Sequence, residues 1–511
     1  HEFSFELNNL SNVEYFRWIS PAPLSYVSKN NTNIALGTYL RSYAFSRLYV
    51  DAILITSFLE GFNDNCLTEL DFDFLNVPVF CIFYDLIPLL KPDLYLNNNP
   101  DFSKYYHKKV KKFRSFTALL AISNSSKNEA VKFLNFDSNN VYNISSACDT
   151  KLFNNFDLDN NKSDINIDNI VPYILYTGAS DPRKNVVNLI HAYSLLNSQL
   201  LKTYKLVLAG KLLEPEIQQI YQWIEIYNLN PSNVHVLGYI SDSDLVMLYK
   251  NCSLFVFPSL HEGFGLPVLE AMTCGAPVIG SYSTSIPEIV GTKKALFNPN
   301  NVIEIKNLIE RSLVDRSFNS FLISNSVNQA KLFSWSNTAS LLIQSLEKYF
   351  SNLNLKQSAS TWEILNENNK RKFQHLINTI QSSRILNKNS SINMIQQISS
   401  SIELINYELD QINRSMFTST NINSWRIEGP FDSNYSLAIL NRNLAKALSR
   451  VVKNIFIHNT EGFGDYKANS DFIKLDPEIY EIYKASLDDK SSCQIVSRNL
   501  YPPRVNDLSA Q

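Results

Sequence analysis

One segment, residues 255–281, constrains the fold more than any other part of the chain. It runs FVFPSLHEGFGLPVLEAMTCGAPVIGS, a pattern that predicts an apolar strand, a glycine-rich turn, a short helix and a second strand. This alternation is typical of parallel α/β sheets. Glu262 and Glu270 stand on either side of the turn. The segment therefore predicts a buried strand that ends in a ligand-binding turn.

The turn itself has the features of a phosphate site. Gly263 and Gly265 have no side chain to block a ligand, and Pro267 suits the start of a helix because its missing N–H costs nothing there. Free amides and the positive end of a helix dipole favour an anion. Glu270 is then placed to accept hydrogen bonds from ribose hydroxyls, and Glu262 points toward the group that the phosphate carries. The amides expected at the phosphates are those of Gly263, Phe264, Gly265 and Leu266.

On these residues the segment resembles the retaining nucleotide-sugar glycosyltransferases of family 4, the group 1 glycosyltransferases, which have the two-domain GT-B fold. In that family the first glutamate contacts the donor sugar, the second holds the ribose, and the turn amides hold the diphosphate. The resemblance gives these roles to Glu262, Glu270 and residues 263–266. The following SYSTSIPEIVG, residues 281–291, is similar to the family's continuation.

A second match lies at YILYTGASDPRKNVVNLIHAYSLL, residues 173–196. Arg183 and Lys184 follow a predicted parallel strand, and open α/β sheets bind ligands at the carboxyl ends of their strands. A solvated basic pair is the less favoured interpretation, because cations at a helix start oppose the helix dipole. Family members have an arginine and a lysine at matching positions, so the resemblance implies that this pair neutralises the departing diphosphate.

Gly178, Lys211 and Asp85 complete the predicted site. Gly178 ends the strand before the basic pair, and Lys211 after KLVLAG is a weaker candidate for the same phosphates. Asp85 ends the strand VPVFCIFYD and is expected to face the cleft, where it binds an acceptor hydroxyl or merely caps the loop at Leu86. The sequence favours neither role. Many relatives have a histidine before this aspartate, where the present chain has Tyr84.

Alternating strands and helices predict two lobes. Residues 170–350 alternate as in a doubly wound parallel sheet and form the nucleotide-sugar-binding lobe by resemblance. Residues 1–156 alternate more loosely, with strands at AILITS, VPVFCIFYD, ALLAIS and NVYNIS, and the Asn- and Asp-rich residues 154–170 predict a polar linker. The predicted fold is α/β, with two Rossmann-like doubly wound domains that face each other across a cleft, as in GT-B. The active site is expected in that cleft.

The first lobe departs from the GT-B pattern at its start, because no strand and glycine-rich loop precede the helix near residues 36–48. Beyond Ser424, WRIEGPFDSNYSLAILNRNLAKALSR predicts a strand, a turn and an amphipathic helix, which is how such a lobe should open. We therefore expect residues 421–511 to begin a second α/β transferase module of a longer, multi-module enzyme. The alternative is that residues 421–465 fold back and supply the strand that the first lobe lacks.

Two segments outside the lobes have helical patterns. Residues 355–415 are polar with apolar positions at heptad spacing, which predicts a helical hairpin spacer or a seam that docks on a lobe or another subunit. YYHKKVKKFRSF, residues 105–116, predicts a helix whose basic face is solvated or rests on anionic lipid near a lipid-linked acceptor. Its cations are Lys108, Lys109, Lys111, Lys112 and Arg114.

Composition limits the partners. The chain has 511 residues and a formal net charge of −2, which gives no general attraction to nucleic acid. No apolar run approaches the ~20 residues that a membrane span needs, and the first residues do not resemble a signal peptide. The six cysteines are scattered without metal-ligand spacing, as reduced core thiols are. We expect a cytoplasmic protein with at most a peripheral contact at the inner face of the membrane.

Three first-lobe segments narrow the resemblance. SFLEGFNDN (57–65), YDLIPLLKPDLYL (84–96) and LAISNSSKNEA (120–130) resemble bacterial mannosyltransferases that build polysaccharides such as O-antigens. The resemblance implies transfer of a hexose, with mannose from GDP-mannose favoured, to a hydroxyl of a growing glycan or lipid-linked oligosaccharide, with retention and with no metal or other cofactor. A UDP-sugar donor stays open because both donors share ribose and sugar hydroxyls. A non-catalytic nucleotide-sugar or glycan-binding module is the second alternative.

Overall fold

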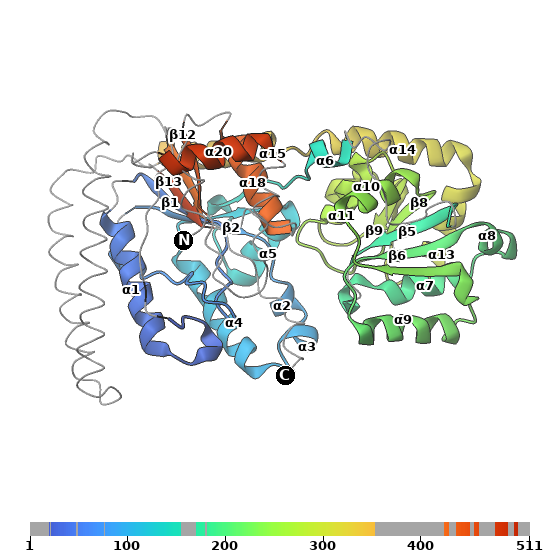
Figure 1. The fold of residues 1–511 in the computed structure, drawn as a ribbon, viewed down its shortest axis with the longest axis horizontal. Helices are drawn as coiled ribbons and strands as arrows, with labels where there is room; N and C mark the ends of the chain where they lie inside the picture. The colour runs from blue at the N-terminus through green and yellow to red at the C-terminus, as the bar shows by residue number, and fades with distance from the viewer. Residues whose placement is uncertain are drawn as a thin grey trace.

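The computed structural model has two lobes, each built around one parallel sheet (Figure 1). The first lobe contains the blue, cyan and red elements, and the second contains the green and most of the yellow ones. The predicted α/β class with two Rossmann-like lobes is therefore confirmed. The structure describes residues 20, 22–47, 50–75, 77–154, 170–178, 181–352, 424–428, 436–449, 454–458, 476–488 and 495–498.

The second lobe's sheet comes from one continuous part of the chain. It has six strands in the order β10-β9-β8-β5-β6-β7, and every neighbouring pair is parallel. β5, β8 and β9 are buried along their whole length, as expected for strands covered on both faces. The strands are β5 (Tyr173–Thr177), β6 (Lys205–Ala209), β7 (Val234–Gly238), β8 (Leu254–Phe257), β9 (Val278–Ser281) and β10 (Leu296–Phe297).

Helices follow these strands as the alternation predicts, with α8, α12 and α14 as additions. The longest of these, α14, has a buried stripe that contains Ser326 and Ala330 and so gives only a weak apolar signal in the sequence. The helices are α7 (Val186–Ser194), α8 (Ser198–Thr203), α9 (Glu214–Ile226), α10 (Asp242–Asn251), α11 (Leu266–Thr273), α12 (Ile286–Val290), α13 (Val302–Val314) and α14 (Arg316–Ala330). Three short 3₁₀ turns are η7 (Pro182–Lys184), η8 (Pro231–Asn233) and η9 (Lys293–Ala295).

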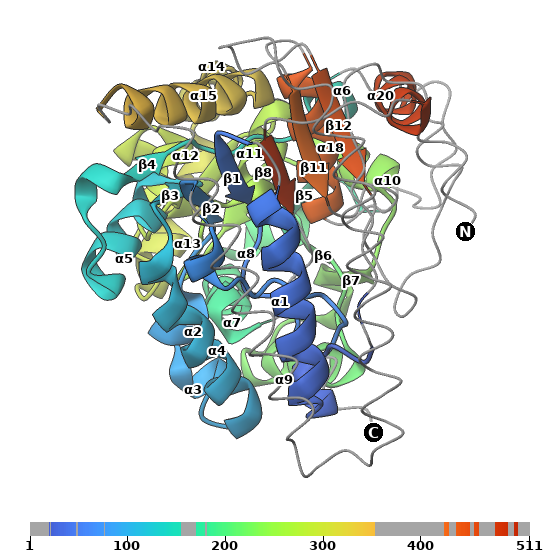
Figure 2. The ribbon, with the colours of Figure 1, turned by 90° about the vertical axis from the view of Figure 1, so that its left-hand side faces the viewer.

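The first lobe's sheet is assembled from two distant parts of the chain. Its seven strands have the order β12-β11-β13-β1-β2-β3-β4, again all parallel. Figure 2 shows the orange and red strands beside the dark blue β1. The strands are β1 (Ala52–Ile55), β2 (Val79–Phe83), β3 (Ala118–Ala121), β4 (Val141–Asn143), β11 (Ser424–Glu428), β12 (Asn454–His458) and β13 (Ile495–Arg498).

This sheet corrects the prediction that residues 421–511 begin a separate module. β13 lies between β1 and β11, with Ala52 and Trp425 both opposite Ile495. The alternative, in which residues 421–465 fold back onto the first lobe, is correct for β11 and β12, but the strand that pairs with β1 is β13, beyond those bounds. The described residues before β1 contain no strand, so β1 would otherwise present an open edge of unpaired backbone groups. Trp425 is fully buried in this position, which adds a large apolar contact to the sheet.

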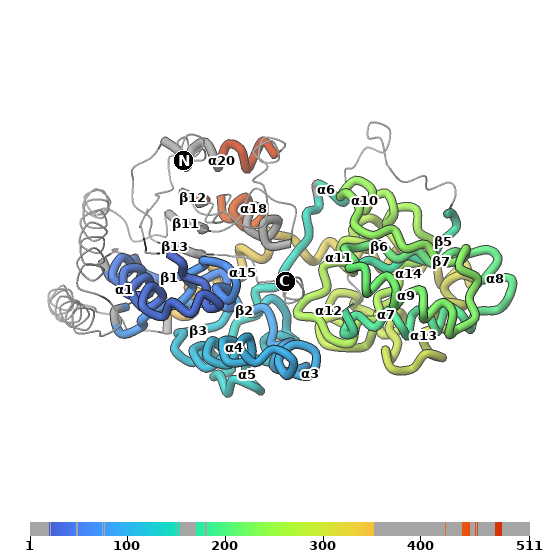
Figure 3. Tube along the Cα trace, turned by 60° about the horizontal axis from the view of Figure 1, so that its bottom comes forward, coloured from blue at the N-terminus to red at the C-terminus, as the bar shows by residue number. Residues whose placement is uncertain are grey.

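The remaining helices cover the first lobe and join it to the second. Helix α15 (Trp335–Asn352) returns from the second lobe to the first and is visible in yellow in Figure 3. Near its end the ring of Tyr349 lies 5.3 Å from that of Phe80 in β2. The predicted spacer, residues 355–415, and nearly all of the predicted linker lie outside the described residues.

The first lobe's helices come from both parts of the chain that build its sheet. They are α1 (Asn31–Arg47), α2 (Ile87–Leu90), α3 (Pro92–Tyr95), α4 (Pro100–Lys112), α5 (Asn124–Leu134), α18 (Ser436–Leu448) and α20 (Pro477–Asp488). The short helix α6 (Thr150–Asn154) follows β4 in the chain but packs against α11 of the second lobe (Figure 1). The 3₁₀ turns are η2 (Tyr26–Ser28), η3 (Phe72–Phe74), η4 (Phe113–Ser115) and η5 (Ser138–Asn140).

Candidate functional site

The two matched segments of the second lobe meet at one edge of its sheet. β5 and β8 are parallel neighbours, so the loops at their carboxyl ends lie together. The N–H of Leu260 donates to the carbonyl of Arg183 at 2.8 Å, and the side-chain amide of Asn185 donates to the carbonyl of Pro258 at 3.1 Å. These bonds fix the basic loop against the glycine-rich turn.

Arg183, Lys184 and Glu262 form a buried charge cluster at this edge. Lys184 Nζ lies 2.7 Å and Arg183 Nη1 lies 2.9 Å from the same oxygen, Glu262 Oε1. Ser259 Oγ also donates to this oxygen, at 2.6 Å. Burial alone would raise the pKa of Glu262, but Lys184 and Arg183 together lower that pKa to about 2. Arg183 Nε also lies 3.9 Å from Asp181 Oδ1, so the two cations face two carboxylates, and an anionic ligand would be a further partner for them.

The glycine-rich turn leaves its amides free. The N–H groups of residues 263–266 donate to no acceptor among the described residues. The turn's carbonyls are fixed instead, because Ser285 Oγ donates to the carbonyls of Glu262 and Phe264. Gly265 begins α11 with a φ of 114°, and a Cβ there would lie 2.6 Å from Ile286 Cδ1. The turn is therefore rigid and presents unused donors at a helix start, as an anion site requires.

Glu270 has a different electrostatic environment from Glu262. It lies on α11, where its Oε2 accepts a hydrogen bond from the hydroxyl of Tyr249 at 3.1 Å. The Tyr249 hydroxyl in turn lies 2.8 Å from Thr177 Oγ1 at the end of β5. Burial raises the pKa of Glu270 to about 7. This carboxyl group therefore changes its charge near neutral pH.

Asp85 comes from the first lobe and lies against the donor turn. Its Oδ1 accepts a hydrogen bond from the N–H of Ile87 at 3.0 Å, which is the local capping role that the sequence left open. A Cβ added to Gly263 would lie 2.8 Å from Asp85 Oδ2, so glycine is needed where the two lobes approach. Burial raises the pKa of Asp85. Its acceptor role remains a prediction.

Gly178 and Lys211 lie at the same sheet edge but differ in their contacts. A Cβ at Gly210 would lie only 2.2 Å from the Gly178 carbonyl oxygen, so the backbones approach closely just after the carboxyl ends of β5 and β6. Lys211 follows Gly210, is exposed, and forms no ion pair with the residues that the structure describes. Lys211 is therefore not part of the charge cluster. Gly178 contributes the closely packed backbone at this sheet edge.

Sequence analysis missed a set of contacts that join the lobes. His261 Nε2 lies 2.7 Å from Glu129 Oε1 in α5, and the other oxygen of Glu129 accepts from the N–H of Leu86, beside Asp85, at 2.9 Å. From α12, Glu288 accepts hydrogen bonds from the N–H groups that start α5, at 2.9 and 2.7 Å. A carboxylate at a helix start is stabilised by the helix dipole. We call the His261–Glu129 contact and the Glu288 hydrogen bonds to the start of α5 the lobe clamp.

Hydroxyl groups of the first lobe also reach the second. Ser123 Oγ donates to the carbonyl of Gly263 at 2.7 Å, and Tyr95 donates to Asp181 Oδ2 at 2.6 Å. Arg183 Nε donates to the same tyrosine oxygen at 3.2 Å. The capping role of Ser123 at the start of α5 is a local pattern that a sequence can reveal, but its partner lies 140 residues away.

A cavity of about 440 Å³ opens beside the lobe clamp. Its walls include Lys91, Lys132 and Phe133 from the first lobe and His261 and Thr284 from the second.

In the part of the chain that is described, no group of three or more His, Cys, Asp or Glu side chains is arranged to hold a metal ion. None of the described helices combines the length and apolar character that crossing a membrane requires.

Comparison with known proteins identifies the family. Residues 157–329 match the family "Glycosyl transferases group 1". The serotype-specific mannosyltransferase WbdA of Escherichia coli is 37% identical over 342 residues, which are 66% of this chain and 41% of that protein. The O-antigen chain mannosyltransferase B of Escherichia coli is 42% identical over 166 residues, or 32% of this chain and 43% of that protein. The chain thus spans less than half of each of these relatives.

Among solved structures, the sucrose-phosphate synthase from Thermosynechococcus elongatus is similar, with a TM-score of 0.45 and 22% identity. The aligned part covers 55% of this chain and 69% of the synthase chain. The family match contains Arg183, Lys184, Glu262 and Glu270. Residues 157–329 therefore form a group 1 glycosyltransferase domain, and the chain is related to the serotype-specific mannosyltransferases.

Proposed function

We propose that this chain transfers a hexose, namely mannose from GDP-mannose, to a hydroxyl of a growing glycan in surface polysaccharide biosynthesis, with retention at the anomeric carbon. The observation that carries the proposal is the meeting of Arg183 and Lys184 on Glu262 beside turn amides that have no acceptor among the described residues. The choice of mannose rests on the relatives, which are named as mannosyltransferases. A cytoplasmic location is part of the proposal.

The charge cluster explains how the donor would be held. A diphosphate offers Arg183 and Lys184 a further anionic partner, and the amides of residues 263–266 bind its oxygens. Glu262 then turns from its ion pairs to the hydroxyls of the sugar, while Glu270 accepts hydrogen bonds from the ribose. Fixed donors aimed at the leaving diphosphate stabilise the charge that develops there, which is usually the largest contribution to catalysis.

The transfer itself exchanges one bond at the anomeric carbon. The bond from this carbon to the phosphate oxygen breaks, the acceptor oxygen bonds to the carbon on the same face, and the hydroxyl proton passes to the departing phosphate. No covalent enzyme intermediate is needed for retention by this route. Asp85, next to Gly263 and to the lobe clamp, is proposed to hold the acceptor hydroxyl. The acceptor is a glycan or a lipid-linked oligosaccharide.

A transfer assay tests the proposal. The chain is incubated with GDP-mannose or UDP-glucose and a short mannose oligosaccharide, and the product linkage is determined by nuclear magnetic resonance. We expect an α-linked mannoside from GDP-mannose. Lys184→Ala should lower the rate by roughly 10²–10³-fold, the loss typical of one donor to a developing anion. Lys202→Ala removes the charge of an exposed second-lobe lysine and serves as the control.

Any other outcome of the transfer assay would change one part of the proposal. Transfer from UDP-glucose alone would replace the donor, and a β-linked product would contradict retention. Binding of a nucleotide sugar without transfer to any acceptor would favour the alternative of a non-catalytic nucleotide-sugar-binding module. An unchanged rate in Lys184→Ala would remove the role given to the charge cluster.

A further inference from the structure

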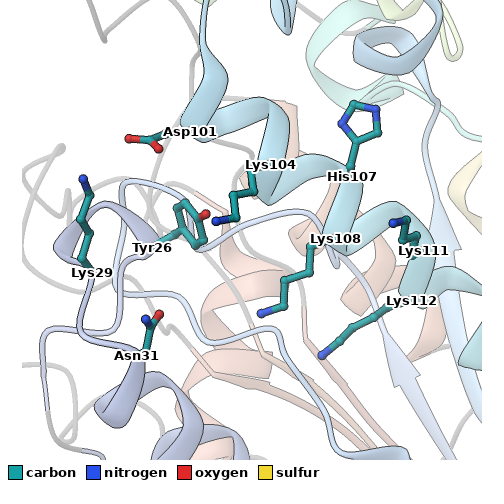
Figure 4. Close-up of a pocket in the computed structure, with 9 residues that line it drawn as sticks. All are labelled: Tyr26, Lys29, Asn31, Asp101, Lys104, His107, Lys108, Lys111 and Lys112. Carbon is teal, nitrogen blue, oxygen red and sulfur yellow. The ribbon is translucent and has the colours of Figure 1, made fainter.

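One wide basic concavity of the described residues is a groove on the first lobe, shown in Figure 4. Its volume is about 1010 Å³, and it shares no lining residue with the donor site. One wall is helix α4, and the other is formed by η2 and the start of α1, with Tyr26 and Asn31. We call it the basic groove. Its lysines are Lys29, Lys104, Lys108, Lys111 and Lys112.

Helical spacing places the lysines of α4 along the groove. Lys104, Lys108 and Lys112 are four residues apart, so they form one row on the helix. In Figure 4 these three side chains extend from α4 toward the wall that carries Tyr26 and Asn31. Eight residues of helix span roughly 12 Å. The row is therefore long enough to contact more than one phosphate group.

The groove differs from the basic face that the sequence predicted. Lys109 was expected on that face, but its side chain is only 1% exposed and lies 3.6 Å from Glu69 inside the lobe. Lys29 and Lys104 were not predicted, and both are exposed groove residues. The prediction was wrong for Lys109 because this residue lies four positions after Tyr105 and three after Tyr106, so helical spacing places it on the same buried side of α4.

The groove keeps an excess of positive charge. Glu69 lies beneath it and pairs with Lys112 and, at 3.7 Å, with Lys108. Burial would raise the pKa of Glu69, but the neighbouring lysines lower it to about 2, so Glu69 is charged. Five lysines against Asp101 and Glu69 still leave a net charge of +3, in a protein whose formal net charge is −2. Lys29 and Lys104 form no ion pair with any described residue.

We propose that the basic groove is a second anion site, separate from the donor site, that binds the phosphate groups of a ligand with more than one phosphate. Ammonium groups are compact point charges that suit phosphate oxygens, and a net charge of this size in a concave surface concentrates anions. Two sources share this chemistry: a soluble diphosphate or polyphosphate, and the headgroups of an anionic membrane surface. The groove could therefore anchor the enzyme while the donor site works.

Two binding measurements distinguish these sources. Sedimentation with phosphatidylglycerol vesicles, beside phosphatidylcholine vesicles, measures attachment to an anionic surface. Titration calorimetry with inorganic pyrophosphate, performed in the Lys184→Ala background that weakens the donor site, measures binding of a soluble anion to the groove. The test variant combines Lys29→Ala, Lys104→Ala and Lys108→Ala, all exposed. The control combines Lys202→Ala, Lys293→Ala and Lys331→Ala, which remove the same charge from exposed positions of the second lobe.

We expect the groove variant to lose binding by about a hundredfold, since each of the three lysines near an anionic surface contributes roughly fivefold. The control should bind like the unmodified chain. Loss confined to vesicles supports the proposal with a membrane as the source, and loss confined to pyrophosphate supports it with a soluble ligand. The proposal is overturned if neither anion binds at low salt, or if the groove variant and the control behave alike. GDP binding is independent of these outcomes.

Discussion

The two lobes obtain their sheets in different ways. The second lobe builds all six strands from residues 173–297, whereas the first combines residues 52–143 with strands that begin at residue 424. The charged groups of the candidate donor site lie in the second lobe, whose sheet is continuous in sequence. The first lobe contributes contacts that position them. Function is therefore easiest to predict where neighbours in space are also close in sequence.

The largest expected effect comes from the continuous lobe. Arg183→Ala removes a cation that lies 2.9 Å from Glu262 and bonds to Tyr95 across the cleft. We expect transfer to fall by roughly 10²–10³-fold, as for one lost donor to a developing anion. Arg183→Lys keeps the charge but not the forked geometry and should recover part of the rate. Equal losses in both variants would mean that charge alone does not explain the role of Arg183.

A second prediction tests the composite sheet. Trp425→Ala empties a fully buried position in β11 and should lower the free energy of unfolding of the first lobe by about 3–5 kcal/mol. Hydrogen exchange should accelerate in β1 and β2 but not in β5. GDP binding should survive. Leu175→Ala in β5, also fully buried, is the matched change in the other lobe and should weaken GDP binding as well. Unchanged exchange in β1 would contradict the composite sheet.

The lobe clamp gives a third, smaller effect. Glu288→Ala removes two hydrogen bonds of 2.7 and 2.9 Å to the start of α5, and such charged bonds contribute about 1.5–3 kcal/mol. We expect roughly tenfold slower transfer, a larger open fraction by small-angle X-ray scattering, and unchanged GDP affinity. Glu225→Ala, at an exposed position of α9, is the control. A change in GDP affinity would place Glu288 in the donor site instead.

The smallest predicted effect compares the two glutamates of the donor turn. The pKa of Glu270 is raised to about 7 and that of Glu262 is lowered to about 2. If ionised Glu270 accepts the ribose hydroxyls, the affinity for GDP-mannose should rise by up to about tenfold from pH 6 to pH 8. Glu270→Gln should flatten this profile, measured by calorimetry. A profile that keeps its slope in the variant would assign the titration to another group.

The same two residues affect stability in opposite directions. Unfolded glutamate has a pKa of about 4.3. Glu262 therefore stabilises the folded chain above this pH, and the contribution is lost as pH falls toward 2. Glu270 binds a proton more tightly when folded, so its contribution is present at low pH and is lost as pH rises toward 7. Unfolding of Glu262→Gln and Glu270→Gln across pH 3–8 should separate the two contributions.

Local patterns were sufficient to predict the alternating elements and the donor turn. Apolar runs predicted β1 to β9, of which β1, β2, β3, β5, β8 and β9 are buried along their whole length, and Pro267 marked the start of α11. Parallel neighbours that end at one sheet edge also predicted that Arg183, Lys184 and Glu262 face one ligand, although not that they form ion pairs with one another. These features depend on a few residues at a time.

Contacts between distant segments were not predictable. The partners in the lobe clamp are 132 and 163 or 164 residues apart, and no periodicity connects them. The placement of β13 between β1 and β11 likewise depends on which sheet edge is open, rather than on the residues of the strand. The role of Gly263 was predicted only in part, because the close group in this structure is Asp85 from the other lobe.

The most direct test of the central claim, a nucleotide-sugar site built on the continuous lobe, is calorimetric titration with GDP-mannose, GDP and UDP-glucose. The unmodified chain is measured beside Glu270→Ala and the control Glu225→Ala. We predict that GDP-mannose and GDP bind to the unmodified chain and to Glu225→Ala, and that this binding is largely lost in Glu270→Ala. Failure to bind any of the three ligands, or equal binding in both variants, would contradict this prediction.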